Sequence, residues 1–113
     1  MTAEPISSYT AYFAKKIKEA IVVDGCCSVG GNLIQFALLQ NVTKCIGVEL
    51  NEVRIKYAEN NCQVYGIDKK KLIFLHQSIA DVQILKELDL KPESSELKKL
   101  VFFFDPPWGG LSY

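Results

Sequence analysis

The sequence predicts an α/β fold with a parallel sheet and flanking helices. Short apolar runs of the kind that form buried strands recur along the chain, and stretches with helical spacing separate them. Strands that alternate with helices in this way form parallel sheets. Ligands of such sheets bind beyond the carboxyl ends of the strands, where the strand order reverses. The residues that follow each strand are therefore the candidates for a functional site.

The composition narrows the function classes. A chain of 113 residues is one domain at most. It has 13 Lys plus Arg and 13 Asp plus Glu, so no overall basic field attracts nucleic acid and any RNA contact must be local. No apolar run approaches the length of a membrane span, and the N-terminus lacks the layout of a signal peptide. We expect an intracellular protein with no membrane partner.

The cysteines lack the paired spacing of a zinc site. The four are Cys26, Cys27, Cys45 and Cys62, and the single histidine, His76, cannot complete a ligand set with them. We therefore expect no metal site. The cysteines should be reduced, small and mostly buried side chains.

The N-terminal part of the chain is predicted to be a lead-in followed by a helix. Residues 1–8 are polar, and apolar residues four positions apart beside lysines predict an amphipathic helix over 9–19. We therefore divide the chain into an N-terminal part, residues 1–20, and a core, residues 21–113.

The core begins with a strand, a turn and a helix. The apolar residues 21–23 predict a buried strand over 20–24. Glycines and small residues follow at 25–31 and predict a turn. Asn32 can cap a helix over 33–39, which places several apolar side chains toward the core.

A second strand and helix follow the same pattern. An apolar run predicts a strand over 44–50 that ends near Glu49. Asn51 can cap the next helix, which runs to about Tyr65, and Gly66 is its expected stop.

The last third of the chain contains two strands, a short helix and a charged loop. The pattern predicts a strand over 72–76 and a helix over 79–88. Residues 89–99 are charged and contain Pro92, which indicates a surface loop with one helical turn. The apolar, aromatic run 100–104 predicts a strand buried on both faces.

These strand ends place polar residues at one edge of the sheet. The edge, called here the rim, contains residues 24–32, 49–50, 77–79 and 105–108. Because the carboxyl ends of parallel strands lie at the same edge, these four segments should lie together.

The turn after the first strand has the composition of a ligand-binding turn. Its small residues let a ligand approach the backbone, and the following helix offers N–H groups to a carboxylate or phosphate. Asp24 could bind an ammonium group, whereas a phosphate loop would place no anion there. A ligand with an amine and a carboxylate is indicated, as in the methionine part of S-adenosylmethionine, although a plain strand-to-helix turn has a similar pattern. The candidate residues are Asp24, Gly25, Cys26, Ser28, Gly30 and Asn32.

Glu49 is a candidate for binding ribose hydroxyls. It follows Asp24 by 25 positions, near the spacing of about 20 in nucleotide-binding α/β folds. The alternative is an exposed acid near a helix N-terminus, stabilised by the helix dipole. An NAD site is disfavoured because the Gly-x-Gly-x-x-Gly spacing is absent.

The segment Asp105-Pro106-Pro107-Trp108 follows the last strand and has the groups to bind a ring amine. The prolines lack N–H groups, so the turn is stiff and its carbonyls remain available as acceptors. An aryl amine is a poor nucleophile because its lone pair is delocalised into the ring. The Asp105 carboxylate and the Pro106 carbonyl can accept its hydrogens and orient the lone pair toward an electrophile. A plain proline turn would not explain the acid and the indole.

Asp-Pro-Pro-aromatic resembles motif IV of amino-directed, S-adenosylmethionine-dependent methyltransferases. More narrowly, residues 22–37, 57–61, 64–67 and 106–110 resemble the trimethylguanosine synthase family, and the similarity spans nearly everything from Ile21 onward. The resemblance implies a Rossmann-like class I methyltransferase with S-adenosylmethionine as cofactor. It also implies methyl transfer to N2 of a 7-methylguanosine cap on small nuclear or nucleolar RNA. A nuclear location follows, with the cytoplasm as the alternative.

The resemblance assigns roles to individual residues. Trp108 would stack on the cationic 7-methylguanine beside Pro107, and a cation on an indole gains about 0.5–2 kcal/mol beyond burial. Asp105, Pro106 and Trp108 would form the catalytic group. The resemblance adds Leu50, Ser78, Ile79 and Asp105 to the cofactor-binding residues.

The sequence departs from the family pattern at three positions. Ser28 replaces a usual glycine, Ser78 an acid that contacts the adenine amine, and Asp105 a serine. Two alternatives therefore stay open: an amino-methyltransferase acting on another base or a protein amide, and an inactive domain that binds cofactor or a partner.

The resemblance implies a sheet with further strands after the fourth, so the chain should be truncated there. The strand 100–104 would then be an exposed edge, which the rest of the protein, a second copy in a homodimer or another partner would cover.

Overall fold

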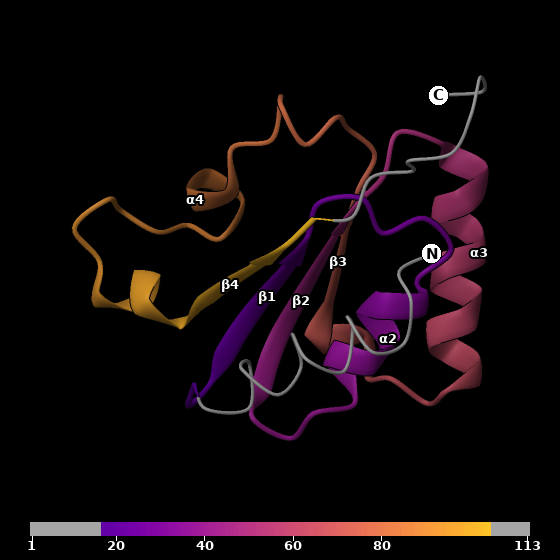
Figure 1. Ribbon diagram of the computed structural model, residues 1–113, viewed down its shortest axis with the longest axis horizontal. Helices are drawn as coiled ribbons and strands as arrows, with labels where there is room; N and C mark the ends of the chain where they lie inside the picture. Colours follow the sequence, from indigo (N-terminus) through magenta and orange to yellow (C-terminus); the bar gives the residue numbers. More distant parts are fainter. Residues whose placement is uncertain (1–16, 105–113) are drawn as a thin grey trace.

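The computed structural model describes residues 17–104, which form a four-stranded parallel sheet with helical segments on both faces (Figure 1). The strand order is β3-β2-β1-β4, and every pairing is parallel. This confirms the predicted fold class. The strands are β1 (Ala20–Asp24), β2 (Val42–Val48), β3 (Leu72–Leu75) and β4 (Leu100–Phe103).

Helices and 3₁₀ turns connect the strands. They are α2 (Gly31–Ala37), α3 (Glu52–Val64), η1 (Lys69–Lys71), α4 (Ile84–Glu87) and η2 (Ser95–Lys99). Among residues 17–104, no helix combines the length and the apolar character needed to cross a membrane.

Each face of the sheet has its own apolar core. On one face, Val22, Cys45 and Phe103 pack with the apolar side of α2. On the other face, Val23, Ile46 and Val48 pack against the segment 79–88, which includes α4. The two layers lie on opposite sides of the sheet in Figure 1. All five residues of β1 are buried because the strand lies between β2 and β4.

The strand order reverses at β1. The chain runs outward from β1 through β2 to β3 and then returns to the other side of β1 as β4. Asp24 at the end of β1 pairs with Phe103 at the end of β4, and the Gly25 N–H donates to the Phe103 carbonyl at 2.9 Å. The point of reversal, where ligands of such sheets bind, therefore lies at the carboxyl ends of β1 and β4.

The second helix follows the sequence prediction closely. The Asn51 side chain caps α3 by accepting from the N–H groups of Val53 and Arg54 at 2.9 and 3.3 Å. Gly66, with a φ of 73°, lies just past the end of the helix, as expected. Strand β2 begins and ends two residues earlier than the predicted 44–50.

The prediction that Asn32 caps the first core helix is wrong. Helix α2 begins at Gly31, its N-cap is Gly30 with a φ of 91°, and no side chain caps it. Glycine adopts this left-handed conformation at little cost, so the helix can begin earlier than the polar residue suggested. Asn32 lies inside the helix and is buried.

The predicted helix over 79–88 is shortened to Ile84–Glu87. Ser78 closes a turn at the start of this segment. Its carbonyl accepts from the Asp81 N–H at 2.9 Å and its hydroxyl oxygen from the Ala80 N–H at 3.3 Å. Serine offers the backbone this local alternative to a helix. The helical turn expected within 89–99 is η2.

The predicted burial of the last strand on both faces is also wrong. Phe103 is buried and packs edge-on against Phe36, with ring centroids 5.4 Å apart. Phe102 and Phe104 point away from this core and are 61% and 57% exposed. Among the described residues β4 pairs with β1 alone, so it is the edge strand that the sequence predicted.

The predicted N-terminal helix does not extend to residue 19. Residues 17–19 form a bend and a turn in which Glu19 has a φ of 56°, and the rest of that helix lies outside the described residues.

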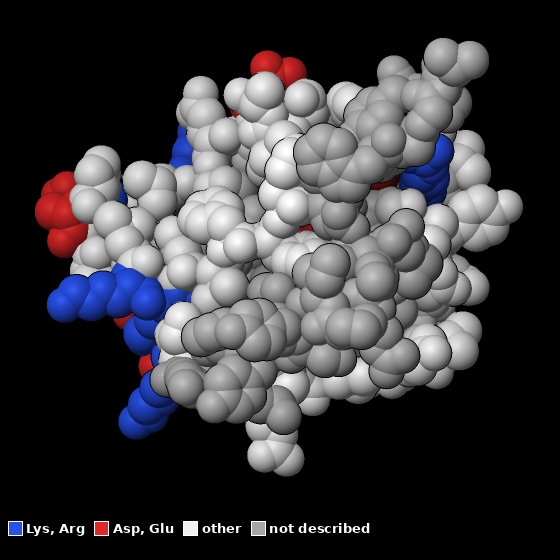
Figure 2. Space-filling view, in the orientation of Figure 1, with Lys and Arg blue, Asp and Glu red and all other residues white. Residues whose placement is uncertain are grey.

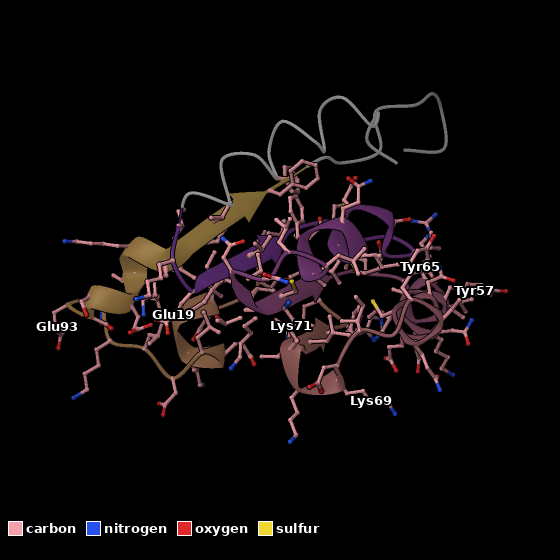
Figure 3. The ribbon with its side chains drawn as sticks, turned by 90° about the horizontal axis from the view of Figure 1, so that it is seen from below. Glu19, Tyr57, Tyr65, Lys69, Lys71 and Glu93 are labelled. Atoms are coloured by element: carbon pink, nitrogen blue, oxygen red, sulfur yellow. The ribbon has the colours of Figure 1, made fainter. Side chains whose placement is uncertain are left out.

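The Lys71 side chain bonds the C-terminal end of α2. Its Nζ donates to the carbonyls of Ala37 and Leu39 at 2.6 and 3.0 Å, at the C-terminal end of α2. Figure 3 shows Lys71 turned toward α2 and Lys69 turned outward. A cation at this helix end satisfies carbonyls that have no partner within the helix.

The cysteines are buried as predicted, with Cys26 half-buried. Burial raises the pKa of the Cys45 thiol to about 12, from 9.0 for an exposed thiol. The folded chain therefore keeps a proton that the unfolded chain loses above pH 9.0. The contribution of the buried, protonated thiol to the free energy of unfolding is complete below pH 9.0. It is lost as the pH rises toward 12.

We expect alkali to destabilise the wild type more steeply than Cys45→Ala. Between pH 9 and 11, the free energy of unfolding should fall by about 1.4 kcal/mol per pH unit more in the wild type. Urea unfolding at several pH values measures this. Parallel pH profiles of the two proteins would contradict the raised pKa.

Candidate active site

The turn after β1 is bonded to both neighbouring strands. The Gly25 N–H reaches β4, as described above, and the Cys27 N–H donates to the Val48 carbonyl of β2 at 2.9 Å. Asp24 is fully buried, and its Oδ1 accepts from the Cys26 N–H at 3.3 Å. The turn therefore has a fixed position beside the point where the strand order reverses, and the buried Asp24 carboxylate lies where the turn begins.

Two residues of this turn have left-handed backbone conformations. Ser28 has a φ of 51° and Gly30 a φ of 91°. Between them, the Val29 carbonyl accepts from the Asn61 side-chain amide of α3 at 2.9 Å. A side chain is strained in this region, so the φ of Ser28 is consistent with the glycine that the resemblance implies at this position.

Glu49 joins this turn to the turn after β2. Its Oε1 accepts from the Ser28 N–H at 3.1 Å and its Oε2 from the Asn51 N–H at 2.8 Å. Arg54 lies 3.9 Å from Oε2. Glu49 is only 5% exposed, which excludes the alternative of a solvent-exposed acid. Each carboxylate oxygen has a second acceptor direction, so both backbone bonds can persist when a ligand hydroxyl binds.

The predicted cofactor residues after β3 reach the same edge. An ideal Cβ on Gly25 would lie 2.9 Å from Phe104 Cδ2 and 3.1 Å from Ile79 Cγ1. Ile79 therefore meets the ends of β1 and β4. Ser78 begins the turn that places Ile79 there. Leu50 presents an apolar side chain that is 67% exposed.

The structure therefore brings three of the four rim segments together. These are residues 24–32, 49–50 and 77–79. The fourth, with Asp105, Pro106, Pro107 and Trp108, lies outside the described residues. The described chain reaches this edge at Phe104, the residue before Asp105.

Three residues that the sequence prediction did not assign to the site contact these turns. They are Arg54 and Asn61 on α3, and His76 after β3. The Nε2 of His76 lies 2.8 Å from the Leu50 carbonyl oxygen. Asn61 and its partner are 32 positions apart, so no local spacing indicates the contact.

The electrostatics of the rim are set by its two buried acids. Burial raises the pKa of the Cys27 thiol, and the carboxylates of Asp24 and Glu49 raise it further. Figure 2 shows blue lysine side chains at the lower left, where β1 and β4 begin in Figure 1, with red acidic atoms among them. Lys99 there bonds Glu19 at 2.9 Å and Glu96 at 3.1 Å. At the rim itself, the two buried carboxylates can accept from ammonium or hydroxyl groups, and Arg54 is a cation beside Glu49.

Comparison with known proteins identifies relatives of this chain. Residues 19–113 match the family model described as RNA cap guanine-N2 methyltransferase. The chain is 33% identical over 97 residues to a trimethylguanosine synthase of Schizosaccharomyces pombe, covering 86% of this chain and 37% of that protein. It is 32% identical over 115 residues to a trimethylguanosine synthase of Saccharomyces cerevisiae, covering 100% of this chain and 34% of that protein. The chain thus spans about a third of the length of these relatives.

Solved structures show the same fold. An RNA methyltransferase from Salinibacter ruber in complex with S-adenosyl-L-homocysteine matches with a TM-score of 0.64 and 15% identity, over 93% of this chain and 78% of that one. A dimethyladenosine transferase from Plasmodium falciparum matches with a TM-score of 0.65 and 17% identity, over 96% of this chain and 34% of that one. The fold is therefore the Rossmann-like methyltransferase fold.

The bonds of Glu49 predict a stability loss in Glu49→Gln. One end of the glutamine amide cannot accept, so either Ser28 N–H or Asn51 N–H loses its acceptor, at about 1–3 kcal/mol. Urea unfolding measures this. Glu52→Gln, on an exposed neighbouring acid, is the control and should stay within about 0.5 kcal/mol of the wild type. Equal losses in both variants would contradict the bonding.

The left-handed conformation of Ser28 predicts that Ser28→Gly stabilises the fold. Glycine relieves the backbone strain, and after the larger entropy of the unfolded chain the net gain should be about 0.5–1 kcal/mol. Ser94→Gly is the control, because Ser94 has a φ of −64° and no strain to relieve. A gain in both variants, or a loss in Ser28→Gly, would show that the strain is absent.

Proposed function

We propose that this chain, which belongs to the RNA cap guanine-N2 methyltransferase family, binds S-adenosylmethionine and contributes to methyl transfer to N2 of a 7-methylguanosine RNA cap. The proposal concerns the whole protein and places it in the nucleus, with capped RNA as its partner. The observation that carries it is the pair of buried carboxylates, Asp24 and Glu49, at neighbouring strand ends, joined through the turn between β1 and α2.

The described residues fit this cofactor. The remaining acceptor directions of the Glu49 carboxylate suit the two ribose hydroxyls. The buried Asp24 carboxylate suits the ammonium of the methionine part, bound directly or through water. The exposed Leu50 side chain and Ile79 would flank the adenine, with Ser78 beside its amine.

The proposed transfer needs an oriented amine. S-adenosylmethionine supplies a methyl group bonded to a positively charged sulfur. The Asp105 carboxylate and the Pro106 carbonyl would accept the hydrogens of guanine N2 and turn its lone pair toward that methyl carbon. The new C–N bond would form as the methyl–sulfur bond breaks, which would release S-adenosylhomocysteine. The methylated nitrogen would then be acidic and lose its proton to solvent, so no strong base is required.

Trp108 would select the methylated cap. The ring of 7-methylguanine carries a positive charge, and a cation on an indole gains about 0.5–2 kcal/mol beyond burial. Pro107 would support the same ring. An unmethylated guanine is neutral and gains less, so the stacking favours the 7-methylated substrate.

This proposal predicts two separable binding events. Calorimetry should show S-adenosylmethionine binding by the wild type and, unchanged, by Trp108→Ala. The wild type should methylate a 7-methylguanosine cap in preference to an unmethylated cap, and Trp108→Ala should reduce that preference by about 2- to 30-fold. Trp108→Phe, which keeps an aromatic face, should lose less.

The cofactor assignment and the role of Trp108 are tested separately. If the wild type binds no S-adenosylmethionine, the cofactor assignment is wrong. If it binds the cofactor but methylates both caps equally, the role of Trp108 is wrong. A panel of substrates tests the alternatives. If methyl transfer occurs only to another base or to a protein amide, that group is the substrate and the assignment of the cap is wrong.

A further inference from the structure

The β2–β3 pairing is extended by a side chain at the rim. The last backbone bond between these strands is donated by the Glu49 N–H to the Leu75 carbonyl at 3.0 Å. One residue further along both strands, His76 Nε2 lies 2.8 Å from the Leu50 carbonyl oxygen. A carbonyl oxygen only accepts, so Nε2 carries the hydrogen and donates it. The imidazole thus takes the place of a backbone donor where the ladder ends.

This contact adds a third bond around Leu50. The Glu49 N–H donates to the Leu75 carbonyl and the Asn51 N–H to the Glu49 carboxylate, while the Leu50 carbonyl oxygen accepts from His76. Glu49 is fixed by the Ser28 and Asn51 N–H groups, and Asn51 caps α3. The Leu50 side chain is 67% exposed, so packing contributes little to its position. The His76 bond ties the Leu50 carbonyl to the residue that follows β3, three positions before Ile79.

We propose that His76 is a positioning residue for the nucleoside end of the cofactor site. By holding the Leu50 carbonyl, it fixes the separation between Leu50 and Ile79, the two apolar side chains that would flank a purine ring. This inference rests on the proposed function. The inference extends the proposed function to His76, which would not itself touch the cofactor but would act through Leu50.

Three variants of the full chain test the proposal. His76→Leu removes the donor, and His76→Gln keeps an amide nitrogen that can donate to the same carbonyl. Lys71→Met is the matched control, because Lys71 also donates from its side chain to backbone carbonyls, but at the C-terminal end of α2. It should lower the melting temperature without changing cofactor affinity.

Calorimetry with S-adenosylhomocysteine should show a dissociation constant raised about three- to tenfold in His76→Leu. His76→Gln should stay within about twofold of the wild type. In methyl transfer, KM for the cofactor should rise in His76→Leu, while kcat and the affinity for the cap stay unchanged. ¹⁵N NMR of the imidazole should show a hydrogen on Nε2 in the ligand-free wild type.

The outcomes separate this proposal from the proposed function. A wild type that binds S-adenosylhomocysteine, together with unchanged affinity in His76→Leu, overturns the role of His76 alone. An equal loss of cofactor affinity in His76→Leu and His76→Gln also overturns the role of His76. So does an Nε2 that carries no hydrogen. A wild type that binds no S-adenosylhomocysteine overturns the proposed function, and the role of His76 with it.

Discussion

The rim depends on one buried carboxylate. Glu49 accepts N–H groups from two different turns, one after β1 and one after β2, and so fixes the distance between them. A buried carboxylate costs free energy unless its oxygens are bonded, and here each oxygen has a backbone donor. The bonds that stabilise this acid are therefore the same bonds that shape the rim. The remaining acceptor capacity of the oxygens faces whatever binds there.

Much of the fold could be predicted because its signals are local. An unbroken apolar run identified β1 to the residue, and the Asn51 cap and Gly66 stop identified α3. The failures come where one local signal competed with another. Gly30 began α2 ahead of the polar Asn32, and Ser78 closed a turn where apolar spacing indicated a helix. Among the three phenylalanines at 102–104, the aromatic run gave no sign that Phe103 alone would reach the core, since that depends on what covers the other face.

The candidate site was predictable in outline. Parallel strands end at the same edge, so Asp24, Glu49 and Ile79 could be placed together from their positions after strands. The contacts that hold the site were not predictable. Asn61 and His76 act through single bonds to residues 32 and 26 positions away, and no residue spacing encodes such pairs. The roles of Asp105, Pro106, Pro107 and Trp108 stay predictions.

The sequence separation of these bonds has a consequence for how the site forms. The contacts between Ser28 and Glu49, Leu50 and His76, and Val29 and Asn61 close loops of 21, 26 and 32 residues. Closing such loops costs chain entropy before the contacts can compensate for it, which slows folding of parallel sheets. We therefore expect the contacts of the rim to form late in folding. These contacts need β3 paired with β2, because His76 follows β3, and β4 paired with β1, because the Gly25 N–H bonds Phe103.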